Sequence, residues 1–310
     1  MTELTLLRDR DFYEDELRLQ AYLGNQLYRG RLAVILGAGV SLQFGLPGWS
    51  ELVRRVAVKA GGSVPPGLEH ALEDAAEVIL TKNYGGDRRR FASAVRDALY
   101  DGCDISFAAL RRNDLLAALA ALVMTSSRGS TSGVITFNFD DILETYLTYH
   151  GFDVEAVASM PAWATRTDVR VYHPHGLLPS DRSGDVTPLV FTRQDFDAVV
   201  GKNELIWRQV LLSVMRSSTC LFLGLSGADS NLTSMLDELN GRDDVKPTHP
   251  ARLRGDLFWG IRFSHSSDPR LVNWENRGVF NVLLPSYDDL PLWLFSVAQR
   301  AAAMRRVEVV

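Results

Sequence analysis

The chain has 310 residues, of which 46% are hydrophobic and 23% are charged, and this length is sufficient for a complete α/β core. Its net charge of −5, from 33 basic and 38 acidic residues, gives no indication of nucleic-acid binding. The two cysteines, Cys103 and Cys220, cannot form a cysteine zinc ribbon, and they fit a reducing compartment. The first residues have no apolar signal core, and no segment reaches the roughly 18 apolar residues of a membrane span. We therefore expect a cytoplasmic protein that binds no membrane.

Helical periodicity covers much of the first half of the chain and returns near its end. The glycine- and proline-rich segment 61–67 interrupts the helical pattern. The sequence between about 68 and 124 predicts helix almost throughout. We interpret this region as a helical insertion near 50–131. The predicted helices cover about 12–29, 49–60, 68–82, 88–100, 115–124 and 202–217, and the tail from 288 onward.

Short apolar runs that are rich in β-branched residues predict the strands. They lie at 32–36, 133–137, 169–173, 219–223, 256–263 and 279–284. Because these strands alternate with helices, the sequence predicts an α/β fold with a doubly wound, mostly parallel sheet. Ligands of such sheets bind beyond the carboxyl ends of the strands.

A glycine loop directly follows the first predicted strand. Gly37 and Gly39 allow the backbone N–H groups to approach a phosphate closely, and Ser41 can cap a helix or bond a phosphate oxygen. The spacing departs from a full G-x-G-x-x-G because residue 42 is leucine. An ordinary strand-to-helix turn is therefore the alternative for this motif alone.

Four polar segments lie beside the ends of predicted strands. They are GAGVS with FGLPGW (37–49), TFNFD (136–140), HPHG (173–176) and GLSGADSNL (224–232). In this order the set resembles the sirtuin superfamily, whose members carry a GAG-[IV]-S loop, a T-x-N-x-D strand end, an HG histidine and a later G-x-S loop. The resemblance covers about 31–49 and 133–284, and it implies a Rossmann-like core within a single domain over 1–310.

Two departures from protein-deacylating sirtuins narrow the resemblance. Those enzymes continue the first loop as G-I-P-D-F-R, whereas this chain has Gly48, Trp49 and Ser50, and they generally carry a four-cysteine zinc ribbon. The chain is more similar to the sirtuin-like NADases of bacterial anti-phage defence. That likeness implies hydrolysis of NAD⁺ to nicotinamide and ADP-ribose, with no metal required.

The resemblance assigns catalysis to Asn138, Asp140 and His175. Asn138 would orient a water at C1′ of the ribose, Asp140 would receive the nicotinamide carboxamide N–H, and His175 would contact the ribose hydroxyls or relay a proton. The alternatives are a helix cap for Asn138 and an acid at a helix N-terminus for Asp140. His173 lies two residues earlier on an extended strand end and is the second candidate for the histidine.

The remaining predicted site residues would bind the rest of NAD⁺. The glycine loop would cradle the pyrophosphate, aromatic rings would wall the nicotinamide pocket, and the late loop would close over the adenosine. For Asp229, capping of the next helix is an equal alternative. The set is Gly37, Ala38, Gly39, Ser41, Phe44, Phe139, Gly224, Ser226 and Asp229.

Two other functions stay open at this stage, an NAD-dependent protein deacylase or ADP-ribosyltransferase, and a non-catalytic module that senses NAD or ADP-ribose. Because a free NADase would kill its host, we expect control by oligomerisation or by a separate partner, such as a HerA-type ATPase or an Argonaute-like protein. The helix near 115–124 is apolar on nearly every side. It is either buried in its own chain or part of a homo-oligomer interface, for which the first helix is a second candidate.

Overall fold

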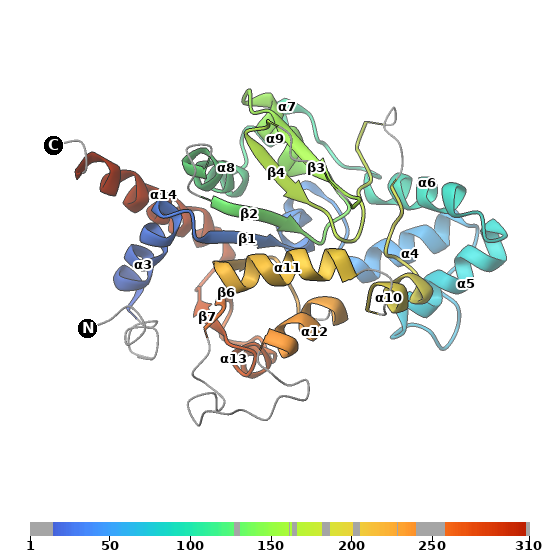
Figure 1. The fold of residues 1–310 in the computed structure, drawn as a ribbon. Helices are drawn as coiled ribbons and strands as arrows, with labels where there is room; N and C mark the ends of the chain where they lie inside the picture. The colour runs from blue at the N-terminus through green and yellow to red at the C-terminus, as the bar shows by residue number, and fades with distance from the viewer. Residues whose placement is uncertain are drawn as a thin grey trace. The chain divides into compact units, whose positions relative to one another are not determined.

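The computed structural model describes residues 15–126, 131–160, 162, 166–181, 187–200, 205–227, 229–239 and 258–307. Its strands form one seven-stranded sheet in the order β3-β4-β2-β1-β5-β6-β7 (Figure 1). The pairs β3–β4, β5–β6 and β6–β7 are parallel, so the predicted α/β class and mostly parallel sheet are confirmed. The strands are β1 (Leu32–Leu36), β2 (Thr131–Thr136), β3 (Val154–Val157), β4 (Val169–Tyr172), β5 (Thr219–Leu223), β6 (Gly260–Ser264) and β7 (Val279–Leu283).

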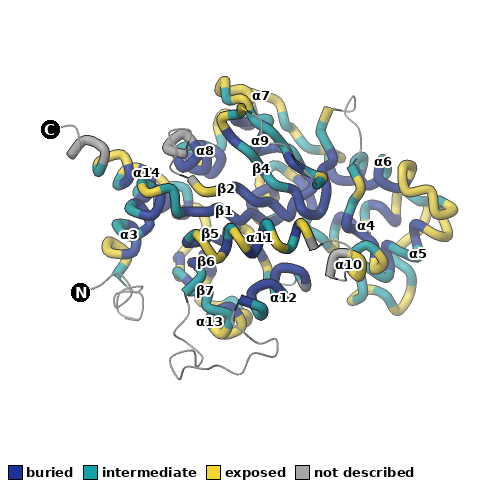
Figure 2. Tube along the Cα trace, viewed as in Figure 1, coloured by how far each residue is buried: buried dark blue, intermediate teal, exposed yellow. Residues whose placement is uncertain are grey.

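Two of the central strands are fully buried, which is why their apolar runs predicted them correctly. β1 and β5 are buried at every position, and both begin and end as predicted (Figure 2). β3 was not predicted. It has four residues at the edge of the sheet, and three of them are only half-buried, so it lacks the continuous apolar run of a central strand.

The helices agree closely with the predicted ones, except that α7, α10 and α13 were missed. Part of the first predicted helix lies outside the described residues. The helices are α3 (Glu16–Tyr28), α4 (Trp49–Lys59), α5 (Leu72–Tyr84), α6 (Arg88–Leu99), α7 (Phe107–Leu110), α8 (Asp114–Ser126), α9 (Ile142–Tyr149), α10 (Arg193–Val200), α11 (Leu205–Ser217), α12 (Ser230–Leu239), α13 (Leu271–Glu275) and α14 (Leu290–Val307).

The chain divides into two compact units, and each is made of several segments. The first unit comprises Met1–Ile35, Arg111–Val134 and Gln209–Val310, and the second comprises Leu36–Leu110 and Ile135–Arg208. The predicted helical insertion is therefore shared: α4 to α7 belong to the second unit, and α8 belongs to the first.

In the first unit, α8 packs against α14 and α3. Leu116 and Leu122 of α8 are fully buried there. A Cβ atom on Gly24 of α3 would lie 2.8 Å from the Cβ of Arg300, so glycine permits the close approach of α3 to α14. Of the two explanations for the apolar helix, burial in its own chain is the one that the structure supports.

In the second unit, α4, α5, α6 and α10 pack together. Asp87 caps α6, since its carboxylate accepts hydrogen bonds from the N–H groups of Arg89 and Arg90. Arg88 at the start of α6 forms an ion pair with Asp195 of α10 at 2.6 Å. The arginine cluster at 88–90 therefore lies at the start of a helix.

Candidate active site

The glycine loop after β1 folds into two short 3-10 turns, η1 (Ala38–Val40) and η2 (Leu42–Phe44). Within η1 the N–H groups of Val40 and Ser41 bond the carbonyls of Gly37 and Ala38. The two preceding N–H groups, of Ala38 and Gly39, lie at the start of the turn, where helical turns leave donors without an internal acceptor. Their predicted contact with a pyrophosphate stays a prediction.

Asn138 follows β2 and lies against the glycine loop. Its Nδ2 atom donates to the Gly37 carbonyl and to Ser41 Oγ, both at 3.2 Å, so both amide hydrogens are used. Among the residues that the structure describes, no hydrogen bond reaches its Oδ1 atom, which can therefore accept one from a ligand or water. The side chain does not cap α9, so the capping alternative for Asn138 is wrong.

Hydrogen bonds link Asn138 through Ser41 to a third residue, Asp140. Ser41 Oγ donates to Asp140 Oδ2 at 2.9 Å, and the N–H of Ile142 donates to Oδ1 at 3.3 Å. The second contact is that of an acid at a helix N-terminus, the alternative raised from the sequence. Burial raises the pKa of Asp140 to about 6, although the Ser41 hydroxyl works against this shift.

His175 lies three residues after the end of β4, and it is 4% exposed. Its ring meets Phe137 edge-on at 5.0 Å and Phe196 of α10 at 5.5 Å, measured between ring centroids. Gly176 has a φ of +94°, and a Cβ atom there would lie 2.3 Å from the Pro188 carbonyl oxygen. Only glycine therefore permits this turn beside His175.

The aromatic residues near this loop form a connected cluster. Phe139 packs on Phe191 at 5.6 Å, and Trp49 packs on Phe191 at 4.7 Å and Phe196 at 6.2 Å. Trp49 therefore packs within this cluster. Phe44 in η2 is half-buried, and its part in a nicotinamide pocket stays a prediction.

His173 differs from His175 in its surroundings. It is fully buried, with Nε2 at 2.5 Å from Glu144 Oε1 of α9 and Nδ1 at 3.2 Å from the Asn138 carbonyl oxygen. Burial works to lower the pKa of His173, but the charge of Glu144 and the hydrogen bond to it outweigh that effect and raise the pKa above its usual value. The sequence did not single out Glu144.

A second, half-buried carboxylate holds the loop that follows His175. Asp141 Oδ2 accepts hydrogen bonds from the N–H and the hydroxyl of Ser180, both at 3.0 Å. Its Oδ1 atom lies 2.9 Å from the Tyr100 hydroxyl, which also lies 2.9 Å from the Leu178 carbonyl oxygen. These partners are between 39 and 78 residues apart along the chain, so no local motif marks them.

All the residues described so far in this site belong to the second unit, whereas Gly224, Ser226 and Asp229 belong to the first. Asp229 Oδ1 accepts a hydrogen bond from the N–H of Leu232 at 2.8 Å, so the carboxylate bonds the first turn of α12. Binding of adenosine by these three residues stays a prediction.

Parts of the chain are similar to known proteins. Residues 132–280 match the family model described as a SIR2-like domain. This segment, just under half of the chain, is similar to SIR2-like domains. The chain is also 25% identical over 276 residues to the NAD(+) hydrolase ThsA of Enterococcus faecium. The aligned region covers 84% of this chain and 53% of that protein. The chain thus spans about half the length of this curated relative.

Two solved structures are similar to the chain. One is a complex of a Sir2 homologue with NAD, at 12% identity, 90% coverage of this chain, 94% of that chain and a TM-score of 0.45. The other is from work on the mechanism and regulation of Sir2 enzymes, at 13% identity, 93% and 98% coverage and a TM-score of 0.45. The order of its own seven-stranded sheet establishes the fold of the chain.

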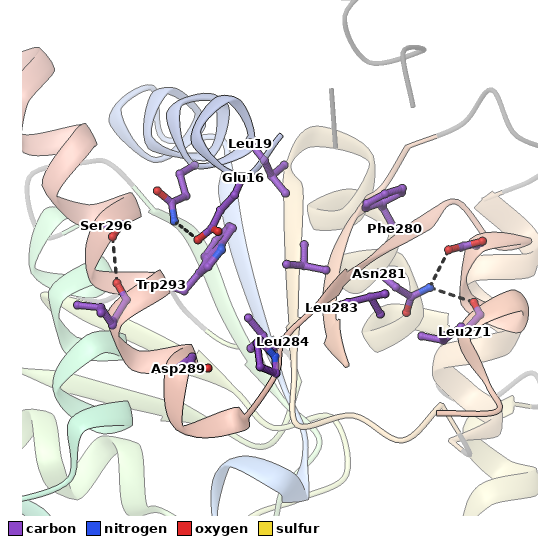
Figure 3. A pocket seen from close by; sticks show the side chains of 15 residues that line it. Glu16, Leu19, Leu271, Phe280, Asn281, Leu283, Leu284, Asp289, Trp293 and Ser296 are labelled. Carbon is purple, nitrogen blue, oxygen red and sulfur yellow. Dashed lines mark hydrogen bonds between the residues drawn. The ribbon is translucent and has the colours of Figure 1, made fainter. Parts of the chain in front are cut away.

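Apart from this site, the first unit of the SIR2-like protein contains a cavity of about 690 Å³ beside the edge strand β7. Figure 3 shows Glu16 and Leu19 of α3, Trp293 of α14 and Leu283 of β7 along its wall. None of the predicted site residues lines it.

Over the described parts of the chain, no helix has the length and apolar character needed to cross a membrane. Over the same residues, no three His, Cys, Asp or Glu side chains are grouped so that they could hold a metal ion. Independence from metal stays a prediction.

Proposed function

We propose that this SIR2-like protein hydrolyses NAD⁺ to nicotinamide and ADP-ribose. The observation that carries the proposal is the chain of hydrogen bonds from Asn138 through Ser41 to Asp140, which uses both amide hydrogens of Asn138 and leaves its Oδ1 atom as an acceptor. The similarity to an NAD(+) hydrolase supports the same conclusion.

The fixed amide would act on the attacking water. A water that donates one hydrogen to Asn138 Oδ1 presents its oxygen lone pair in a defined direction, and no deprotonation of Asn138 is needed. In the reaction the bond between nicotinamide and C1′ breaks, nicotinamide leaves with the bonding electrons, and the water oxygen bonds C1′. One proton is released.

Asp140 and His175 have different roles in this proposal. The Asp140 carboxylate, held by Ser41, would bind the carboxamide N–H of nicotinamide. His175, between Phe137 and Phe196, would contact the ribose and take up the released proton.

The test is release of nicotinamide from NAD⁺ by the purified protein and its variants. Asn138→Ala and His175→Ala should each lower kcat/KM at least about 100-fold, a loss of about 3 kcal/mol of transition-state stabilisation. Asn83→Ala and His150→Ala change exposed residues of the same types and should retain full activity. Equal activity of Asn138→Ala and the wild type would refute the role of Asn138.

The same assay separates the other two functions. A deacylase or ADP-ribosyltransferase would release nicotinamide only when an acyl-lysine peptide or an acceptor protein is added. A sensor would bind NAD⁺ and release none. We further propose that the hydrolysis serves anti-phage defence through depletion of NAD⁺, with activity controlled by assembly or by a partner protein.

A further inference from the structure

A buried acid–histidine pair is bonded to Asn138, and the mechanism above gives it no role. His173 is fully buried at the end of β4, and Glu144 is 8% exposed on α9. The 2.5 Å between His173 Nε2 and Glu144 Oε1 joins elements that are 29 residues apart along the chain.

The position of one proton follows from the acceptor at the other end of the ring. A backbone carbonyl only accepts hydrogen bonds, so the 3.2 Å contact with the Asn138 oxygen requires a hydrogen on His173 Nδ1. The Nε2 atom then shares its proton with the Glu144 carboxyl group. The charged groups that act on the ring are Glu144 of α9 and Asp140 after β2, and both are acidic.

His173 is therefore unlike a general base. Its Nδ1 hydrogen is committed to Asn138, and Glu144 holds the proton at Nε2. The raised pKa of His173 is consistent with an imidazolium paired with a carboxylate. What the ring does in this arrangement is hold the peptide group of Asn138.

Asn138 is thus held at each of its polar groups except Oδ1. Its backbone N–H donates to Thr136 Oγ1 at 3.1 Å, its carbonyl accepts from His173, and its amide hydrogens go to Gly37 and Ser41. Loss of the His173 contact would free the backbone of Asn138 to shift, and its Oδ1 atom would shift with it. Misplacement of a catalytic group by about 1 Å can cost about 100-fold in rate.

We propose that Glu144 and His173 are positioning residues that fix the Asn138 carbonyl and so aim its Oδ1 atom during NAD⁺ cleavage. Glu144 holds the proton at Nε2 of His173, and the Nδ1 hydrogen of His173 holds the backbone carbonyl of Asn138 in place. This inference rests on the proposed hydrolase function.

The kinetic test compares variants that keep or remove each contact. Glu144→Leu and His173→Leu should lower kcat about 10- to 100-fold and leave KM within about twofold, because substrate contacts are unchanged. Glu144→Gln and His173→Asn keep a donor for Nε2 and for the Asn138 carbonyl respectively, so they should recover kcat to within about fivefold of wild type. Leu147→Ala, a buried change on the same α9, should lower the melting temperature and leave kcat unchanged.

Two kinetic outcomes would overturn the inference. One is a wild-type kcat in both leucine variants. The other is an equal loss of kcat in the leucine variants and in Leu147→Ala, which would reduce the pair to a stabilising contact.

A second measurement decides on the pair without any turnover. In a protein labelled with ¹⁵N-histidine, the His173 signals, assigned by their loss in His173→Asn, should show a hydrogen on Nδ1 throughout the range from about pH 6 to pH 8. An unprotonated Nδ1 would overturn the inference even if NAD⁺ is hydrolysed. A protonated Nδ1 in a wild-type protein that releases no nicotinamide would instead refute the proposed hydrolase function.

Discussion

At the scale of single residues, Asp140 links the chemistry of the site to its stability. Its pKa of about 6 in the folded protein lies above the 3.8 of a free aspartate side chain, and burial is the main cause. A raised pKa in the folded state means that the carboxyl group favours folding below about pH 4. That contribution is lost as the pH rises through 6. The ionised form that the proposed reaction needs is therefore the less stable one.

We expect both consequences to be measurable. Nicotinamide release should fall as the pH is lowered through about 6, because Asp140 becomes protonated. Asp140→Asn should abolish release, and its free energy of unfolding relative to wild type should rise by about 3 kcal/mol between pH 4 and pH 7. Chemical denaturation at the two pH values measures this change, and an unchanged difference would contradict the burial of an ionised Asp140.

Gly176 permits the turn beside His175 and gives a second prediction at this scale. In Gly176→Ala the new Cβ would meet the Pro188 oxygen at 2.3 Å, so the backbone must move. We expect a loss of about 3 kcal/mol in the free energy of unfolding, together with a lower kcat. Gly151→Ala is the control, since Gly151 also has a positive φ, of +81°, but no atom lies within 4 Å of its Cβ position. A loss of only about 1 kcal/mol is expected there.

Individual site residues could be predicted from the sequence only where a local motif marked them. Asn138 and Asp140 lie in one TFNFD segment, and His175 precedes a glycine, so their chemistry was visible in a few letters. Glu144 and Phe196 were missed because their contacts with His173 and His175 exist only in the folded chain. A carboxylate on a helix normally indicates solvent exposure, and the sequence contains nothing that would have marked Glu144 as buried.

At the scale of elements, α8 shows what periodicity can and cannot predict. Its apolar character on every side correctly indicated burial. The pattern could not identify the covering helices, because α14 begins at residue 290 and α3 ends at residue 28. The missed α10 has only eight residues, so its periodicity is too short to distinguish it from a loop.

The placement of α8 can be tested by a cavity-forming substitution. Leu116→Ala should lower the free energy of unfolding by about 3 kcal/mol, because Leu116 is fully buried. Leu17→Ala, on the exposed side of α3, should change it by less than about 0.5 kcal/mol. If Leu116→Ala altered the assembly state instead of the stability, α8 would belong to a subunit interface.

At the scale of the whole molecule, α8 no longer supports the predicted homo-oligomer, because this helix is buried in its own chain. Exposed apolar side chains remain on the first unit, among them Leu17 of α3, Leu283 of β7 and Leu292 of α14. Two of these, Leu283 and Leu292, line the cavity beside β7. The first helix, the second candidate from the sequence, therefore stays a candidate interface.

Light scattering at micromolar concentration tests the assembly. We expect a mass above the 34.5 kDa of one chain, and a lower mass in Leu292→Asp, because a buried carboxylate would oppose association. Val58→Asp, at an exposed position of α4 in the second unit, should leave the mass unchanged. A single 34.5 kDa species at every concentration would contradict the oligomer.

The interleaving of the two units constrains the order in which the chain can fold during synthesis. Every segment of the second unit has been made once residue 208 is complete, whereas the first unit also needs residues beyond 209. Both α3 and the apolar α8 pack on α14, which begins at residue 290. On the ribosome, the apolar surface that α8 presents to α14 therefore stays uncovered until residues from 290 onward have been made. During that interval the nascent protein is most exposed to aggregation and to chaperones.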